Sequence, residues 1–310
     1  MRDIIDPIDR KLLIQELTQD KFIRNTNNGP REIFIITAEN APNTLREIGR
    51  LRELSFREAG GGTGKDCDLD SYDLKAPLFK QLIVWDPEES EIVGGYRFLE
   101  GIKIAKNSSG IHQSPTSGLF QFSEKFINKY LPHVIELGRS FVQPDFQPHY
   151  NIRKGIYSLD NLWDGLGALL VDNPVIHYFF GKITMYPRYN IIARDLILYF
   201  LSKYFPDPEN LVRPYTAVEI TTPEDELEAI FTGNNFEENY KLLVKHVRRY
   251  GENIPALVNA YMNLSSTMKT FGTSINPQFG NVEETAILIT ISDIYEQKKQ
   301  RHVSRYKGKI

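Results

Sequence analysis

The pattern of predicted strands constrains the fold of this chain more than any other feature. Residues 78–85 and 91–99 are strand-like segments joined by the turn Asp86-Pro87-Glu88-Glu89. Farther along, predicted strands at 133–142 and 176–184 enclose a helix that begins at Ser158. A chain with paired strands early and a strand-helix-strand unit late is expected to form a mixed β-sheet with helices on both faces.

The other predicted elements divide into two groups along the chain. The first group comprises a helix over 6–19 opened by Asp6-Pro7, a strand at 32–38, a helix capped by Asn43 and an apolar helix at 190–204. Prolines then cluster between 206 and 214, and the second group holds helices near 223–231, 236–250 and 254–264 and a strand at 285–291. We therefore expect an α/β protein with a lobe at 1–205 and a C-terminal helical and strand extension, 206–310, packed on it.

Composition and charge exclude several classes of protein. The chain has 310 residues, 41% of them hydrophobic, which is ample for a buried core, and one cysteine, Cys67, which excludes an internal disulfide. A net charge of −3 disfavours a nucleic-acid binder. The apolar run 191–201 is broken by Arg194 and Asp195 and is shorter than the ~20 residues of a transmembrane helix. The first residues are charged and do not resemble a signal peptide, so we expect a cytoplasmic protein.

The glycine-rich segment 59–65 only superficially resembles a phosphate-binding loop. Ala59 replaces the first glycine of the Walker pattern, Asp66 replaces its Ser or Thr, and a helix precedes the segment where a strand should be. We interpret it as a flexible hinge. The six histidines are scattered without a metal-ligand spacing, so no metal site is predicted.

Two charges in the strand at 133–142 are more informative. Glu136 and Arg139 would point to opposite faces of a regular strand. Gly138 lies between them, and a glycine inside a strand often marks a bulge that inserts one residue. A bulge there would turn both charges toward one cleft and leave a backbone N–H able to polarise a thioester carbonyl. An edge strand with solvated charges explains the same residues equally well.

Arg97 lies in an otherwise apolar strand, where an unpaired charge would be costly. We expect it to have a carboxylate partner, and Glu136 on a neighbouring strand is the natural candidate. Asp70 and Asp73 lie three residues apart in a polar loop, where simple solvation suffices for a pair considered alone. Arg52 is expected at the rim of the core face of its helix.

Taken in order, four short motifs resemble the signature of one enzyme family. They are Arg52-x-x-x-Phe56, Asp70-x-x-Asp73, Gly95-Tyr96-Arg97 and Glu136-x-x-Arg139. The set is similar to that of the acyl-homoserine-lactone synthases and the related N-acyl amino acid synthases, including the glycine- and ornithine-lipid N-acyltransferases. The resemblance spans about 45–205, and the later segments 250–257 and 276–280 look like the C-terminal part of the lipid-type members.

The resemblance implies a GNAT-like fold and an enzyme that transfers a (3-hydroxy) fatty acyl group from acyl carrier protein to the amine of a small amino acid. Glycine is the first choice of acceptor and ornithine the second, and the product would enter aminolipid biosynthesis. No cofactor is implied, because the acyl thioester is a co-substrate. A net-negative enzyme would need a basic patch for the acidic carrier protein. The candidates are Arg50, Arg52 and Arg57, then His246, Arg248 and Arg249, and the tail 298–309, which is expected to be frayed and could also contact the inner membrane.

Residue roles follow from the same resemblance. Glu136 would accept the ammonium proton, through a water molecule. Arg139 and Arg97 would orient Glu136 or bind the acceptor carboxylate. The substrate-binding positions would be Arg52, Phe56, Asp70, Asp73, Gly138, Ser140, Phe141 and Trp163, with the two aspartates shaping the acceptor pocket.

Two other classes of protein remain open. An acetyl-CoA-dependent acetyltransferase of this fold would carry a basic or amide residue before its paired glycines, and the nearest segment, 162–167, has Leu162 there. A non-catalytic lipid- or carrier-binding protein should lose Glu136 or Arg139, and both are present. The tryptophan that signalling synthases carry between the first two motifs is missing, which puts a homoserine-lactone product in doubt.

Overall fold

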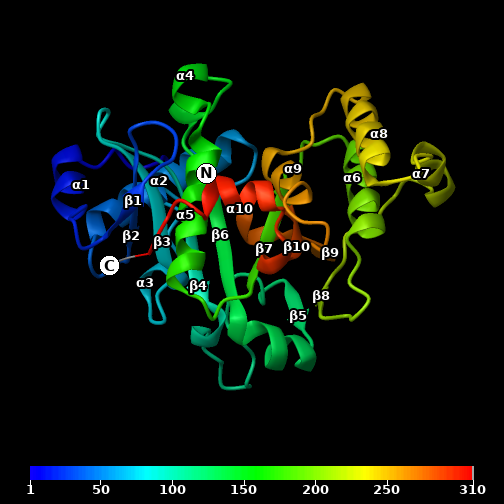
Figure 1. The fold of residues 1–310 in the computed structure, drawn as a ribbon, viewed down its shortest axis with the longest axis horizontal. Coiled ribbons are helices and arrows are strands. Elements are labelled where there is room, and N and C mark those ends of the chain that lie inside the picture. Colours follow the sequence, from blue (N-terminus) through cyan, green and yellow to red (C-terminus); the bar gives the residue numbers. More distant parts are fainter. Residues whose placement is uncertain (309–310) are drawn as a thin grey trace.

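A computed structural model, which describes residues 1–308, has an eight-stranded mixed sheet at its centre (Figure 1). In spatial order its strands are β1 (Phe22–Asn25), β2 (Glu32–Ile36), β3 (Lys80–Asp86), β4 (Glu91–Glu100), β6 (Val134–Val142), β7 (Tyr178–Met185), β10 (Val282–Thr290) and β9 (Lys269–Asn276). Neighbouring strands are antiparallel except β6 and β7, which are parallel. A separate sheet pairs β5 (Phe120–Phe122) with β8 (Val212–Pro214).

Helices cover both faces of the sheet, as predicted. α2 (Pro42–Glu58), with α1 (Arg10–Glu16) beside it, packs on one face, and α5 (Ser158–Asp172) and α6 (Ile191–Tyr204) pack on the other. The remaining helices are α3 (Ser71–Leu74), α4 (Ile152–Gly155), α7 (Glu224–Ile230), α8 (Phe236–Arg249), α9 (Ala256–Met262) and α10 (Glu296–His302). The expected mixed α/β architecture is confirmed. Within residues 1–308, no helix is both long enough and apolar enough to cross a membrane.

Each face of the sheet has its own apolar core. Side chains of α2, among them Ile48 and Leu51, pack with Ile83 and Ile92 of β3 and β4. On the opposite face, α5, α6, α8 and α9 enclose a larger core that includes Leu82 and Tyr96. Because strand residues alternate between faces, neighbours such as Leu82 and Ile83 belong to different cores.

The C-terminal part of the chain enlarges the same sheet. β10 pairs with β7 from Glu283 opposite Met185 to Thr290 opposite Tyr178, and β9 forms the edge beyond it. The sheet therefore continues across the boundary expected at residue 205.

The basic tail is more ordered than expected. Residues 296–302 form α10, which packs on α5. His302 Nδ1 lies 2.8 Å from Asp164 Oδ1, and both side chains are buried. The expectation of fraying is wrong for this helix, and Lys309 lies outside the described residues.

The glycine-rich loop after α2 is fixed by the chain itself. The Glu53 carboxylate accepts the backbone N–H of Thr63 at 3.0 Å and that of Gly64 at 2.8 Å. These amides, which a phosphate would bind in a Walker loop, are therefore occupied by an internal carboxylate. The hydrogen bonds to Glu53 tie the segment to α2 and argue against its interpretation as a flexible hinge.

Candidate active site

A bulge interrupts β6 where the sequence predicts it. In the ladder with β4, Gly95 lies opposite Phe141 and Arg97 lies opposite Gly138, so β6 carries one more residue than β4 between these pairs. Arg139, inside the bulge, has a φ of +49°, in the left-handed region that non-glycine residues rarely adopt. The predicted bulge near Gly138 is confirmed.

At the bulge, β6 and β7 separate. Their parallel ladder ends at Leu137 opposite Gly181. Residues 138–142 of β6, with Lys182 and Thr184 of β7, then contribute to the wall of a cavity of about 540 Å³. From here on the backbone of β6 has no ladder partner in β7, although Val142 O accepts a hydrogen bond from Gln147 Nε2 at 2.7 Å.

The bulge places Glu136 and Arg139 on the same sheet face. Glu136 lies opposite Leu99, two residues from Arg97 on β4, so it shares the face of Arg97. Arg139 turns to this face too, and its Nε lies 2.9 Å from Asp68 Oδ2. Arg139 lines the cavity, whereas Glu136 lies behind its wall and is 1% exposed.

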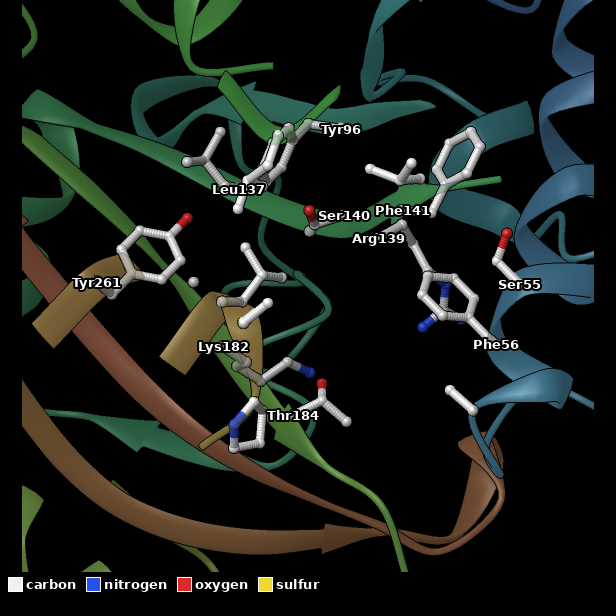
Figure 2. A pocket seen from close by; sticks show the side chains of 18 of the residues that line it. Ser55, Phe56, Tyr96, Leu137, Arg139, Ser140, Phe141, Lys182, Thr184 and Tyr261 are labelled. Atoms are coloured by element: carbon white, nitrogen blue, oxygen red, sulfur yellow. The ribbon is translucent and has the colours of Figure 1, made fainter. Parts of the chain in front are cut away.

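The cavity has a polar half and an apolar half, and it passes through the sheet where β6 and β7 separate. The polar half, on the α2 face, includes Arg97, Arg139, Lys182, Thr184 and Glu284. The apolar half, on the α5 and α9 face, includes Leu137, Leu159, Phe179, Leu257, Ile287 and Ile289. Figure 2 shows Ser55 and Phe56 at one end and Tyr261 at the other. This division suits a ligand with a charged head and an apolar chain.

Asp73 joins two buried arginines beside the polar half. Arg52 Nη1 lies 3.2 Å from Asp73 Oδ1, and Arg97 Nη1 lies 3.2 Å from Asp73 Oδ2. Arg97 Nη1 also lies 2.8 Å from Asp70 Oδ2, and Gln81 Nε2 donates to Asp73 Oδ1 at 3.0 Å. Burial alone would raise the pKa of Asp73, but the charges of Arg97 and Arg52 lower it to about 2.

These contacts correct two expectations. The partners of Arg97 are Asp70 and Asp73, not Glu136, because the two aspartates form the capping box at the start of α3, which directs both toward Arg97. Arg52 is fully buried and does not lie at a rim. Arg52, Asp70 and Asp73 therefore do not line the cavity; they hold in place Arg97, which does.

Arg139 is held by a carboxylate and an aromatic ring. Besides its contact with Asp68, its Cζ lies 3.9 Å from the centroid of the Phe279 ring, which is cation–π geometry. Asp68 is 1% exposed, and burial raises its pKa although Arg139 and Arg52 act to lower it. Asp68 is not part of the four sequence motifs, and sequence reasoning missed this pairing.

Glu136 is a buried carboxyl with one satisfied oxygen. Its Oε1 accepts the backbone N–H of Thr116 at 3.0 Å, and its Oε2 has no hydrogen-bond partner among the described residues. Burial raises the pKa of Glu136, while hydrogen bonds from Ser114 and Thr116 and the charge of Lys182 oppose the rise. Thr116 lines the cavity, so it links Glu136 to the polar half.

Sequence reasoning missed an ion pair on the cavity wall. Lys182 Nζ lies 2.7 Å from Glu284 Oε2 and donates to Pro115 O at 2.9 Å. Glu284 Oε2 also accepts from Asn276 Nδ2 at 3.0 Å. Each charge interrupts a mainly apolar strand, so the argument applied to Arg97 could have found both.

The remaining predicted substrate-binding residues divide into two groups. Those that line the cavity are Phe56, Gly138, Ser140 and Phe141. Trp163 does not reach it, because its ring packs edge to face against Tyr261 in the core, with centroids 5.4 Å apart. The placement of Trp163 as a residue in contact with substrate is therefore corrected.

The paired glycines of α5 serve helix packing. A Cβ at Gly165 would lie 2.6 Å from Leu82 Cδ2, and one at Gly167 would lie 2.2 Å from the carbonyl oxygen of His302. Both glycines are inside the helix, far from its first residue, Ser158. They permit close approach of β3 and α10 and do not present free amides at a helix start.

The three α2 arginines proposed as a basic patch, Arg50, Arg52 and Arg57, are not free surface cations. Arg50 Nη2 lies 2.6 Å from Glu47 Oε1, and Arg57 Nε lies 2.7 Å from Glu53 Oε1. With Arg52 buried, the early-helix candidate for a basic patch is weakened. Arg248 and Arg249, at the end of α8, are exposed.

Two known acyltransferases are similar to this chain over nearly its whole length. The chain is 52% identical over 306 residues to the glycine N(alpha)-acyltransferase of Bacteroides thetaiotaomicron, covering 99% of this chain and 91% of that protein. The glycine N(alpha)-acyltransferase of Phocaeicola vulgatus is 51% identical, over 99% of this chain and 94% of its own. This chain belongs to their family of N-acyltransferases.

The family assignment confirms the resemblance drawn from the four motifs. Residues 51–154 of this N-acyltransferase match the acetyltransferase (GNAT) domain, a range that includes β3, β4 and the bulged β6. Among solved structures, the acyl-homoserine lactone synthase LasI is 13% identical, with coverage of 91% of this chain and 98% of that one and a TM-score of 0.37.

Proposed function

We propose that this N-acyltransferase transfers a 3-hydroxy fatty acyl group from the thioester of acyl carrier protein to the amine of glycine. The observation that carries the proposal is the single cavity with one polar and one apolar half, which meet where β6 and β7 separate. The polar half suits an amino acid and the apolar half suits a fatty chain. The name of the two relatives supports glycine as the acceptor.

The charges of the polar half favour glycine over ornithine. Arg139 offers a guanidinium on the wall, and this fork-shaped group suits a carboxylate. Among the described residues that line the cavity, Glu284 is the acidic one, and it is already paired with Lys182. The second ammonium of ornithine would therefore lack a free carboxylate, whereas glycine needs none.

The proposed reaction needs one base and no covalent enzyme intermediate. The glycine nitrogen loses a proton and attacks the thioester carbonyl; the C–N bond forms, the C–S bond breaks, and the carrier thiol leaves with a proton. Glu136 is the proposed base, acting through a water molecule, because burial raises its pKa and so makes its carboxylate a stronger proton acceptor; the Thr116 N–H holds it in place. Backbone N–H groups at the bulge would polarise the carbonyl.

The structure around α5 supports a carrier protein over coenzyme A as the donor. The paired glycines, which would bind a pyrophosphate at a helix start, are buried against Leu82 and His302. A carrier protein presents only its pantetheine arm, so it does not require such a site. The protein would then act in the cytoplasm, at times on the inner membrane surface, and supply an N-acyl amino acid to aminolipid synthesis.

The donor assay tests this proposal. Purified protein is incubated with glycine and, separately, a long-chain 3-hydroxyacyl carrier protein, the same acyl group on coenzyme A, and acetyl-CoA. We expect the largest kcat/KM with the carrier protein. An equal or larger kcat/KM with acetyl-CoA would overturn the assignment of the donor.

A further inference from the structure

Three side-chain hydroxyls meet inside the apolar half of the cavity. Tyr96 from β4, Ser140 from β6 and Tyr261 from α9 all line it. The two tyrosines are almost fully buried, at 2% and 6% exposure. Figure 2 shows Tyr96, Tyr261 and Leu137 together, away from Ser55 and Phe56 at the opposite end.

The surroundings of the two tyrosine hydroxyls offer few polar groups to compensate for their burial. The nearby wall is apolar and includes Leu137, Phe179 and Ile287. The Tyr96 hydroxyl lies against those of Ser140 and Tyr261, but it makes no well-formed hydrogen bond within the described structure. A buried hydroxyl without a partner is costly, whereas a phenylalanine would fill the same space without that cost. A ligand group that completes the hydrogen bonding is therefore expected.

We infer that Tyr96, Ser140 and Tyr261 form a subsite that binds a hydroxyl group on the acyl chain. The inference rests on the proposed function, because it assumes that the apolar half holds the chain. An alcohol both donates and accepts a hydrogen bond, so it can pair with two of these hydroxyls at once. An unsubstituted chain in the same place would leave the Tyr96 hydroxyl unpaired.

The position of the subsite indicates which part of the acyl chain carries the hydroxyl group. Ser140 immediately follows Arg139 in the bulge of β6, at the edge where the thioester carbonyl would lie. The three hydroxyls are thus close to the carbonyl end of the chain, while residues such as Leu257 and Ile289 line the cavity elsewhere in the apolar half. A hydroxyl on a carbon near the thioester fits this arrangement, and one near the methyl end does not.

The test compares two donors of equal chain length. The value of kcat/KM with glycine is measured for 3-hydroxyacyl carrier protein and for the unsubstituted acyl carrier protein, in wild type, Tyr96→Phe and Tyr261→Phe. Tyr215→Phe, at an exposed tyrosine, is the matched control. We expect wild type to prefer the hydroxylated donor. Tyr96→Phe should lower that preference by about tenfold, the effect of one hydrogen bond at a buried site, and the control should retain it.

The outcomes separate this inference from the proposed function. Equal kcat/KM values for the two donors in wild type would overturn the inference while leaving acyl transfer to glycine intact. The same fractional loss with both donors in Tyr96→Phe and Tyr261→Phe would also overturn it, because that pattern indicates packing damage. Transfer from neither donor would contradict the proposed function itself. Should Tyr96→Phe fail to fold, Tyr261→Phe provides the same comparison.

Discussion

Arg97 Nη1 lies 3.2 Å from Asp73 Oδ2, and both side chains are almost completely excluded from solvent. The other oxygen of the same carboxylate contacts Arg52. One aspartate of α3 therefore connects the strand that carries Arg97 to the helix that carries Arg52. Through this connection the guanidinium of Arg97 is held on the wall of the cavity.

Replacing Asp73 with asparagine should destabilise the protein strongly. Two buried guanidiniums would lose a shared counter-charge, and breaking such a pair from one side costs about 3–5 kcal/mol in the free energy of unfolding. Urea denaturation measures the loss. Asp70→Asn is the control, and its effect should be smaller because Asp70 is partly exposed and Arg97 keeps Asp73. Equal losses for the two variants would contradict this account.

The contribution of Asp73 should also depend on pH. Its folded pKa, about 2, lies below the ordinary 3.8, so the unfolded chain binds more protons between these values. The stabilisation is therefore fully present above the ordinary pKa and is lost as the pH falls toward the folded one. The difference in stability between wild type and Asp73→Asn should shrink when unfolding is measured through this acidic window. A difference that stays constant there would count against the pairing.

Glu136→Gln should lower turnover by about 10²-fold or more, the usual scale for loss of a general base. Because burial raises the pKa of Glu136, the wild-type rate should fall on acidification at a pH above the ordinary 4.5 of a glutamate. The variant should lack this acid limb. Glu284→Gln is the comparison, since Glu284 also borders the polar half. A larger loss in Glu284→Gln, with near-normal activity in Glu136→Gln, would transfer the role of base to Glu284.

Arg139→Lys should raise the KM for glycine by about tenfold while changing kcat less. Lysine keeps the charge opposite Asp68 but cannot form the two parallel hydrogen bonds that a guanidinium makes with a carboxylate. Arg50→Lys, on α2 and paired with Glu47, is the matched control and should leave both constants unchanged. An unaltered KM for glycine in Arg139→Lys would remove Arg139 from acceptor binding.

Carrier-protein binding should weaken with salt. Exposed charges are screened over about 8–10 Å at moderate ionic strength, so the KM for the carrier protein should rise as salt is added. Reversing the charges of the exposed Arg248 and Arg249 should raise it further. The same reversal at Arg50 and Arg57, which already pair with glutamates, should matter less. A KM that does not respond to salt would exclude electrostatic docking.

The fold could be predicted where its signals are local. The strand segments 78–85 and 91–99 correspond to β3 and β4, because strand composition and a turn lie within one short stretch. The prediction that Asn43 caps α2 is wrong: the helix begins at Pro42, and the cap comes from Glu16 of α1. Its carboxylate accepts the N–H of Asn43 at 3.0 Å and that of Thr44 at 2.7 Å. A partner so distant in sequence leaves no local signal.

The site was predictable to a similar degree. The bulge was inferred from Gly138 between two charges, and the structure has it. The ion pairs of Arg97 could not be predicted from the sequence. Arg97 contacts Asp70 and Asp73 only because α3, with its capping box, folds next to β4. Lys182 and Glu284 come together because β10 pairs with β7, an arrangement that single strands do not specify.

Acceptor specificity tests the central claim most directly. Purified protein is incubated with 3-hydroxyacyl carrier protein and one amino acid at a time, including glycine, alanine, serine and ornithine, and the products are identified by mass spectrometry. The account predicts N-acyl glycine as the dominant product. Ornithine should be acylated poorly, because Glu284, the acidic residue among the described residues of the cavity wall, is already paired with Lys182. Exclusive acylation of ornithine or another amine, or no acylation of any amine, would contradict it.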